Sequence, residues 1–424
     1  MPSLVGSEMC IRDSFWADAA GSSKAQTLYL WGNKMAKKRS RGPKLDYLLV
    51  LIVATLLVIG LMMVYSSSFD LAYRVYGQPT YFFIRQLIWA ALGVVGMAFM
   101  AWIEYHAWRR FSVPLMAGAL LLLTIVLLFG SERFGAYRSL WKGSIQPSEL
   151  SKLAIIIYIA DWLSSKGEKI RQVTYGLIPF AILIGLVAGL IVMQPDFGTA
   201  ILIVVTAIAM FFIAGADLLQ LGVGLVFGGA TFAFLISRSQ HASERIKDFL
   251  ASFGSSYQDY HVQQSLSALM SGGPFGNGLG EGYHKLGFLP FAHTDSIFAV
   301  LGEELGLIGC LMLLGLFVAL AYRGFKIALE APDAFGTVLA SGITFWLIFQ
   351  ALINIAVATA TLPFTGIPLP FVSYGGSSLI VSMAGVGLLL SISRSAQERE
   401  AEESADRDFG WWYRRPRVSG LGRR

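Results

Sequence analysis

Charge is scarce in this sequence. Only 14% of its 424 residues are Asp, Glu, Lys or Arg, whereas a soluble domain carries about a quarter. Hydrophobic residues make up 55% of the chain, and the mean hydropathy is +0.60. An integral membrane protein is therefore expected, and a single soluble core is excluded. The formal net charge of +6 does not call for nucleic acid as a partner, because Lys and Arg at the cytoplasmic ends of membrane helices give the same sign.

Cysteine is scarce as well, since the chain holds only Cys10 and Cys310. This excludes a disulfide framework and a cysteine metal site. The sequence also lacks a Walker loop and an HExxH motif. The glycines of "GNGLGEG" lie in a loop rather than at a strand-to-helix turn, so they do not predict a dinucleotide site. No organic cofactor is expected, and no internal repeat indicates an inverted-repeat transporter.

Long apolar runs dominate what is present. A helix that crosses a bilayer needs about 17–25 apolar residues. The sequence predicts an all-α polytopic membrane protein with about ten transmembrane helices, and a long extracytoplasmic loop (237–294) between the seventh and eighth. Basic residues of the short loops favour cytoplasmic termini. The predicted spans are 45–65, 82–102, 111–130, 148–164, 174–193, 197–214, 218–236, 295–321, 335–358 and 370–393.

The membrane domain, residues 45–393, is flanked by segments of different composition. Residues 1–34 have no signal-peptide pattern and are expected to be a non-native or disordered extension. A basic cytoplasmic N-terminus follows at 35–44. The charged tail, 394–424, is poor in aliphatic residues and is expected to be a disordered cytoplasmic segment.

Polar motifs gather on the predicted outer side. "HTDS" (293–296) opens the eighth helix, and Asp295 is either its N-cap or a general base or divalent-cation ligand at a cavity mouth. Glu303 and Glu304 follow about two and a half turns later. Glu303 is expected near the helix face of Asp295 and Glu304 is expected to be rotated away. The alternative for both is a role as polar contacts between packed helices.

Three further charged residues have both a structural and a functional interpretation. Glu149 and Lys152 are three residues apart on one helix face, and they form either a neutralised structural pair or the wall of a polar cavity. Asp196 follows a proline in a tight turn, where it is either an N-cap or a site residue. The prolines and glycines of "TGIPLPFVSYGGSS" (365–378) predict re-entrant or cavity-lining backbone.

The motifs "QPSELSK", "QPDFGTA", "FLPFAHTDSIFAVLGEELG" and "GIPLPFVSYGGSS" together resemble the SEDS family (shape, elongation, division, sporulation), whose members are FtsW, RodA and SpoVE. The resemblance covers about residues 43–394. The first helix, "YFFIRQLIWA" and the loop before helix eight look more like FtsW or SpoVE than RodA. Two departures concern the loop: Ser296 replaces an aromatic residue common in the family, and "FLPFAH" lacks an acidic residue.

The resemblance implies a peptidoglycan glycosyltransferase that polymerises lipid II at the outer face of the bacterial cytoplasmic membrane. A class B penicillin-binding protein and other division membrane proteins are the implied partners. Asp295 maps onto the family's essential acidic residue, and Glu149 and Lys152 map onto its ion pair. The alternatives are a lipid II flippase and a non-enzymatic scaffold. An elongation or sporulation role is the alternative to cell division.

An inverting displacement at a sugar pyrophosphate needs a base for the acceptor hydroxyl and a cation for the leaving pyrophosphate. We expect Asp295 to be the base, or the ligand of a divalent cation, Mg²⁺ or Mn²⁺. The candidates for binding substrate are Arg85, Arg133, Arg138, Lys142, Asp196, Lys285, His293, Thr294, Ser373 and Ser377, and Lys152 is partly committed to Glu149.

Overall fold

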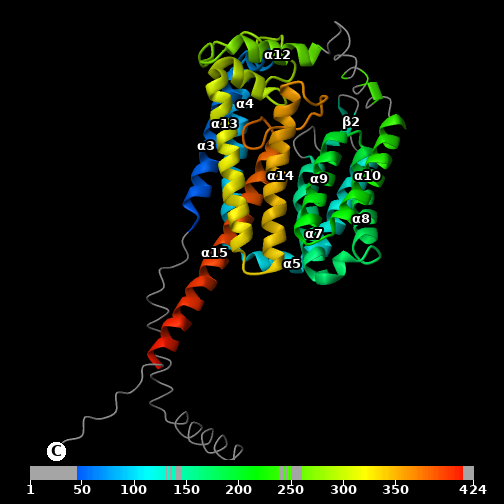
Figure 1. Ribbon diagram of the computed structural model, residues 1–424. Helices are drawn as coiled ribbons and strands as arrows, with labels where there is room; N and C mark the ends of the chain where they lie inside the picture. Colours follow the sequence, from blue (N-terminus) through cyan, green and yellow to red (C-terminus); the bar gives the residue numbers. More distant parts are fainter. Residues whose placement is uncertain are drawn as a thin grey trace, which may run out of the picture. The chain divides into compact units, whose positions relative to one another are not determined.

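The computed structural model describes residues 45–413 except 130, 134–135, 140–145, 239–242, 245–246, 248 and 250–259 (Figure 1). Residues Leu45–Ser395 form one compact unit, a helical bundle. The predicted extension (1–34) and basic N-terminus (35–44) lie outside the described residues.

The predicted apolar runs are all helical, as lipid requires: backbone N–H and C=O groups that cannot reach water must bond within the segment. The prediction of an all-α polytopic membrane protein is confirmed. The helices at the ten predicted spans are α3 (Tyr47–Tyr76), α4 (Tyr81–Trp102), α6 (Ser112–Phe129), α7 (Pro147–Lys166), α8 (Leu177–Val192), α9 (Phe197–Ile213), α10 (Leu218–Arg238), α13 (Ile297–Glu330), α14 (Ala334–Ala358) and α15 (Gly376–Tyr413).

Within the described residues, six of these helices are long and apolar enough to cross a membrane by length and composition: α3, α4, α6, α13, α14 and α15 up to Ala401. The apolar helices α8, α9 and the Leu218–Thr231 part of α10 are shorter. Helix α7 carries several charged residues. Ten crossings therefore remain a prediction.

Several segments differ from the predictions. Strands β1 (Ser131–Arg133) and β2 (Ala136–Ser139) form an antiparallel hairpin after α6. The loop predicted at 237–294 includes the helix α12 (Tyr260–Gly272). The tail predicted to be disordered from residue 394 continues as α15 up to Tyr413. Its Ala, Glu and Arg residues favour helix, and Arg399 pairs with Glu403 one turn later.

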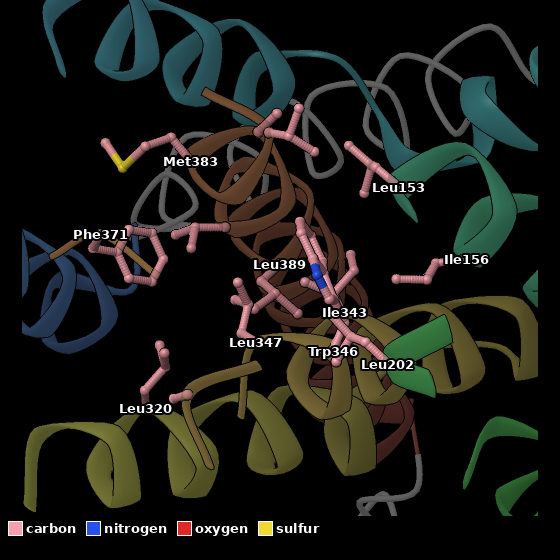
Figure 2. Close-up of a cluster of buried hydrophobic side chains, with 14 of the residues drawn as sticks. Leu153, Ile156, Leu202, Leu320, Ile343, Trp346, Leu347, Phe371, Met383 and Leu389 are labelled. Atoms are coloured by element: carbon pink, nitrogen blue, oxygen red, sulfur yellow. The ribbon is translucent and has the colours of Figure 1, made fainter. Parts of the chain in front are cut away.

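Helix α12 lies at one end of the bundle (Figure 1). Helices α4, α7, α9, α13 and α15 begin at this end, which we call the α12 end. The short helix α5 (Tyr105–Arg110) lies at the other end, where the 3₁₀ helix Gly167–Arg171 follows α7. Between the ends, side chains from α7, α9, α13, α14 and α15 form a buried hydrophobic core around Trp346 (Figure 2).

Helix α13 is broken at Gly306, whose φ of 67° and ψ of −166° lie outside the helical region. By the helical rise, the break lies roughly 14 Å from the first residue of α13. The loop after α12 fills it. The N–H groups of Asn277 and Gly278 donate to the carbonyls of Glu303 and Glu304, at 3.0 Å each. In return, the N–H groups of Leu307 and Ile308 donate to the carbonyls of Gly273 and Pro274, at 2.9 and 3.2 Å.

This exchange of hydrogen bonds requires glycine where the two segments meet. A Cβ at Gly306 would lie 2.3 Å from the backbone nitrogen of Gly276, and a Cβ at Gly276 would lie 2.2 Å from the carbonyl oxygen of Glu304. Both glycines also have positive φ, a region that costs other residues about 1–2 kcal/mol. The loop thus replaces one turn of the helix.

Candidate functional site

The turn His293–Asp295, which precedes α13, is held through three consecutive carbonyl groups. The N–H of Tyr374 donates to the carbonyl of His293 at 2.9 Å, and Ser373 Oγ donates to that of Thr294 at 2.6 Å. Asn354 Nδ2, from α14, donates to the carbonyl of Asp295 at 2.9 Å. The backbone that carries the Asp295 carboxylate is therefore fixed by two other segments of the bundle.

The Asp295 side chain is half-buried at the α12 end. Ser296 occupies the N-cap position of α13, and its side chain makes no capping hydrogen bond. The N-cap interpretation of Asp295 is therefore wrong, because the helix begins one residue later than it requires. The backbone that carries the carboxylate thus belongs to the turn that precedes the helix.

The side chain of His293 lies among aromatic rings. Its ring centroid is 5.0 Å from that of Phe82 and 5.7 Å from that of Tyr374. Burial lowers the pKa of His293 to about 4, so the imidazole is neutral near pH 7. Burial also raises the pKa of Tyr374, whose phenol stays protonated. His293 and Tyr374 therefore offer neutral hydrogen-bonding groups beside Asp295.

Glu303 and Glu304 both face the loop that fills the break in α13. Glu303 accepts hydrogen bonds from the backbone N–H of Tyr283 at 2.7 Å and from His284 Nδ1 at 2.9 Å. Glu304 accepts from Lys285 Nζ and from Ser66 Oγ on α3, both at 2.6 Å. Glu303 and Glu304 point in different directions from the helix, as expected of adjacent residues, but the loop supplies partners to both of them. Their role as polar packing contacts is confirmed.

These contacts change the interpretation of Lys285. Its ammonium group donates to Glu304, to Ser66 Oγ at 2.9 Å and to the carbonyl of Gly280 at 2.8 Å. An ammonium group has three N–H donors, so these contacts occupy all of them. Lys285 is buried and committed to the loop, which leaves it no donor for a pyrophosphate.

The pair Glu149 and Lys152 on α7 is an ion pair, with Nζ 2.8 Å from Oε2 and exposures of 3% and 2%. Lys152 Nζ also donates to Gln350 Oε1 at 3.1 Å, and Trp346 Nε1 donates to the same oxygen at 2.9 Å. Gln350 Nε2 donates in turn to the carbonyl of Pro368. The pair thus joins α7 to α14 and to the 365–375 loop, which supports its structural interpretation.

The hydroxyl and carboxylate candidates have structural contacts. Asp196 is the N-cap of α9 as predicted: its carboxylate accepts from the N–H of Thr199 at 3.3 Å and from the Thr199 hydroxyl at 3.0 Å. Ser373 Oγ accepts from the N–H of Leu369 as well as donating to Thr294. Ser377 Oγ accepts from the N–H of Gln146. The Thr294 hydroxyl donates to the carbonyl of Phe291.

Of the remaining basic candidates, Arg85 is the one whose side chain the structure describes. It lies in the second turn of α4, and its Nη1 donates to the Tyr81 hydroxyl at 2.8 Å. Among the described residues, no carboxylate forms an ion pair with it. Arg133 and Arg138 lie on β1 and β2, and only their backbone is described. Lys142 lies outside the described residues.

Some residues of this region were not predicted. Asn354, Gln350 and Ser66 are buried polar residues in apolar helices, with exposures of 2%, 0% and 8%. A polar residue at membrane depth was the available signal, because such residues bond to one another or line a cavity. Asn354 bonds to Asp295, which is 59 positions away, and Ser66 bonds to Glu304, which is 238 positions away. Sequence spacing does not reveal such partners.

No cluster of three or more His, Cys, Asp or Glu side chains suited to a metal ion occurs in the part of the chain that the structure describes. Mg²⁺, however, is commonly held by one or two carboxylates together with substrate phosphates. Asp295 therefore fits a cation that is shared with a substrate and does not fit a closed protein site.

The fold and this arrangement define a polytopic membrane protein with a polar site at one end of its bundle. A sequence profile of the FtsW/RodA/SpoVE family, described as "Cell cycle protein", matches residues 47–398. The chain belongs to this family, and the SEDS resemblance is confirmed.

Individual relatives are similar in sequence to this chain over most of its length. A "Probable peptidoglycan glycosyltransferase FtsW" of Trichlorobacter lovleyi is 40% identical over 370 residues, which cover 85% of this chain and 96% of the relative. The stage V sporulation protein E of Bacillus subtilis is 42% identical over 358 residues, covering 82% and 97%.

Solved structures show the same fold. The rod shape determining protein RodA of Thermus thermophilus matches with a TM-score of 0.63 and 29% identity, covering 83% of this chain and 97% of that one. A chain from work described as "Structural coordination of polymerization and crosslinking by a peptidoglycan synthase complex" matches with a TM-score of 0.67 and 29% identity, covering 83% and 98%.

Proposed function

We propose that this chain is a peptidoglycan glycosyltransferase that polymerises lipid II into glycan strands. The observation that carries the proposal is the half-buried carboxylate of Asp295, on a turn whose three carbonyl groups are each bound by another segment. A general base must be held in position to act. The names of the FtsW relatives support the reaction.

In the proposed reaction, the hydroxyl of the acceptor sugar attacks C1 of the donor sugar. A C1–O bond to the acceptor forms while the bond from C1 to the pyrophosphate oxygen breaks. Asp295 takes the hydroxyl proton, and the polyprenyl pyrophosphate leaves with the bonding electron pair. The configuration at C1 inverts, since the reaction is a single displacement. A divalent cation held by Asp295 and the substrate would supply charge neutralisation at the pyrophosphate.

The proposed location is the bacterial cytoplasmic membrane, with the α12 end outside. The basic residues of the short loops, such as Arg109, Lys166 and Arg323, support this orientation because they lie toward the α5 end. A class B penicillin-binding protein is the proposed partner, supported by the match to a chain from a synthase complex. Other division membrane proteins are further proposed partners. The FtsW relatives favour a role in division, and the similarity to the sporulation protein keeps a sporulation role as the alternative.

The test is polymerisation of labelled lipid II by the purified chain with its partner. We expect Asp295→Asn and Asp295→Ala to abolish glycan formation while retaining the wild-type unfolding temperature. Glu281→Gln is the matched control, because Glu281 is an exposed carboxylate in the preceding loop. Polymerisation by Asp295→Ala at the wild-type rate would refute the catalytic role. Transfer of lipid II across liposome bilayers without glycan formation would instead identify a flippase, and neither activity would favour a scaffold.

A further inference from the structure

Asn354 lies one turn before the end of α14 and is 2% exposed. Its Nδ2 donates to two carbonyl groups, that of Asp295 at 2.9 Å and that of Ile367 at 2.8 Å. An amide nitrogen carries two N–H donors, so both are used. Because both acceptors are carbonyl oxygens, they also fix which end of the amide points toward them. One side chain of α14 thus joins the turn before α13 to the 365–375 loop.

Local backbone features explain why a side-chain donor suits these two carbonyl groups. The ladder of α13 begins at the carbonyl of Ser296, which accepts from a backbone N–H of the first turn at 3.0 Å. The carbonyl of Asp295 therefore precedes the ladder. Ile367 is followed by Pro368 and Pro370, which have no N–H to donate. A donor from another element of the bundle meets the need of both positions.

A second amide on the same face of α14 holds the loop in place. Gln350 lies four residues before Asn354, so the two side chains are neighbours on the helix surface. Gln350 Nε2 donates to the carbonyl of Pro368 at 2.9 Å, and its Oε1 accepts from Lys152 Nζ at 3.1 Å. The two amides bind adjacent carbonyl groups of the loop. The support of Asn354 therefore extends to the Lys152 ammonium group on α7.

The other end of the Asn354 amide has a different status. Its Oδ1 is buried, and no donor within the described residues bonds to it. A buried polar atom without a partner is costly, and folded proteins satisfy most such atoms. An arrangement that served stability alone would satisfy this acceptor as well as the two donors. The donors, which hold the Asp295 turn, are therefore the part of the side chain that the structure uses.

We propose that Asn354 is a positioning residue for the proposed reaction, and that it sets the direction of the Asp295 carboxylate through the backbone of the turn. The proposal rests on the proposed function, because Asn354 acts through the proposed base and not by contact with substrate. Binding the Asp295 carbonyl fixes the peptide plane between Asp295 and Ser296, and with it the bond that leads to the carboxylate. A catalytic group displaced by about 1 Å loses on the order of 100-fold in rate, and neighbouring residues must hold it to about 0.5 Å.

The first test is steady-state polymerisation of labelled lipid II by the purified full chain with its partner. Asn354→Leu has a similar volume and removes both donors. We expect its kcat to fall about 10- to 100-fold while KM and the equilibrium affinity for lipid II stay within about threefold. Asn354→Gln keeps the amide donors on a longer side chain and should recover part of kcat. Asn354→Ser is the milder variant, and a loss of kcat of about threefold or more decides the matter should Asn354→Leu fail to fold.

Gln220→Met is the matched control. Gln220 is also a buried amide, 3% exposed, whose Nε2 donates to a carbonyl group, that of Arg171. Its Oε1 likewise has no partner among the described residues. It lies at the α5 end, away from Asp295. We expect Gln220→Met to lower the unfolding temperature about as much as Asn354→Leu and to keep kcat within about twofold of wild type.

The second test measures the turn itself. The N–H groups of Thr294 and Ser296 both donate to the carbonyl of Phe291, so their exchange with deuterium reports opening of the turn. We expect Asn354→Leu to speed exchange in the 291–296 segment about tenfold or more, and Gln220→Met to leave it at the wild-type rate. This readout needs neither substrate nor activity.

Wild-type kcat in a folded Asn354→Leu variant, where the wild-type protein makes glycan, would overturn the positioning role and leave the proposed function intact. An equal loss of kcat in Gln220→Met would overturn it too, because the loss would then follow from general destabilisation. A change confined to KM would point to substrate contact and would also refute it. A wild-type protein that never polymerises lipid II would refute the proposed function instead, and the exchange rates would still show whether Asn354 holds the turn.

Discussion

The ammonium group of Lys285 lies 2.6 Å from Oε1 of Glu304, and the two side chains are 1% and 0% exposed. One charge comes from the loop before α13 and the other from the helix itself. Together with Ser66 they tie three segments of the chain at the α12 end.

Replacement of Lys285 by Met should therefore strongly destabilise the protein. It leaves the Glu304 carboxylate buried without its counter-charge, a change that costs about 3–5 kcal/mol. Arg74→Met is the control, because an exposed pair contributes at most about 1 kcal/mol. Thermal unfolding in detergent measures both. Similar midpoints for the two variants would show that the buried pair contributes no more than a surface pair.

Gly306→Ala should open the junction between α13 and the loop. Alanine there has an unfavourable φ and its Cβ meets the backbone of Gly276 at 2.3 Å. We expect a loss of at least about 2 kcal/mol of stability. Gly315→Ala lies further along the same helix in open space and should be neutral or stabilising by up to about 1 kcal/mol. Proteolysis of the 273–285 segment measures the junction directly. Unchanged protection in Gly306→Ala would contradict the proposed fit.

The Glu149–Lys152 pair should show strong coupling. Lys152→Met alone leaves a buried carboxylate and should cost about 3–5 kcal/mol, whereas the double variant Glu149→Leu, Lys152→Met should recover most of the stability, since apolar pairs commonly replace buried ion pairs. A double-mutant cycle of unfolding midpoints measures the coupling. Additive losses would mean that each residue acts through Gln350 or other partners instead.

Stability should fall on acidification partly through His293. Burial lowers its pKa to about 4 from 6.5, so the unfolded chain binds a proton across this interval that the folded chain does not. The contribution of the neutral imidazole is complete above about pH 6.5 and is lost as the pH falls toward 4. Carboxylates titrate in the same range, so the measurement is the difference in unfolding midpoint between wild type and His293→Phe from pH 8 to 4. A difference that does not vary with pH would contradict the lowered pKa.

Sequence patterns predicted the positions of the long helices because uninterrupted apolar segments in lipid can satisfy their backbone only as helix or closed barrel. The N-cap at Asp196 and the i,i+3 pair of Glu149 and Lys152 were also predictable, since both are local relationships. The position of Asp295 just before α13 followed from the polar motif that precedes an apolar run.

What the sequence did not reveal depends on distant contacts. Gly306 looks like an ordinary helix glycine in "GEELGLIG", and only the return of residues 273–278 shows why its positive φ is needed. Likewise, helical periodicity gave directions for Glu303 and Glu304 but not the loop that both bind. From the sequence, Lys285 was a candidate substrate ligand, and only the structure shows that its ammonium group forms an ion pair with Glu304.

The break in α13 bears on how this protein tolerates changes in length. Four backbone groups of residues 273–278 complete the hydrogen bonding of the span, so inserting or deleting one residue there would shift that set and leave groups unpaired at membrane depth. An insertion elsewhere in a surface loop costs only chain entropy. A hydropathy profile assigns this membrane span to α13 alone. In the structure, its backbone hydrogen bonds come from two stretches of sequence, α13 and residues 273–278, which must keep a fixed register relative to each other.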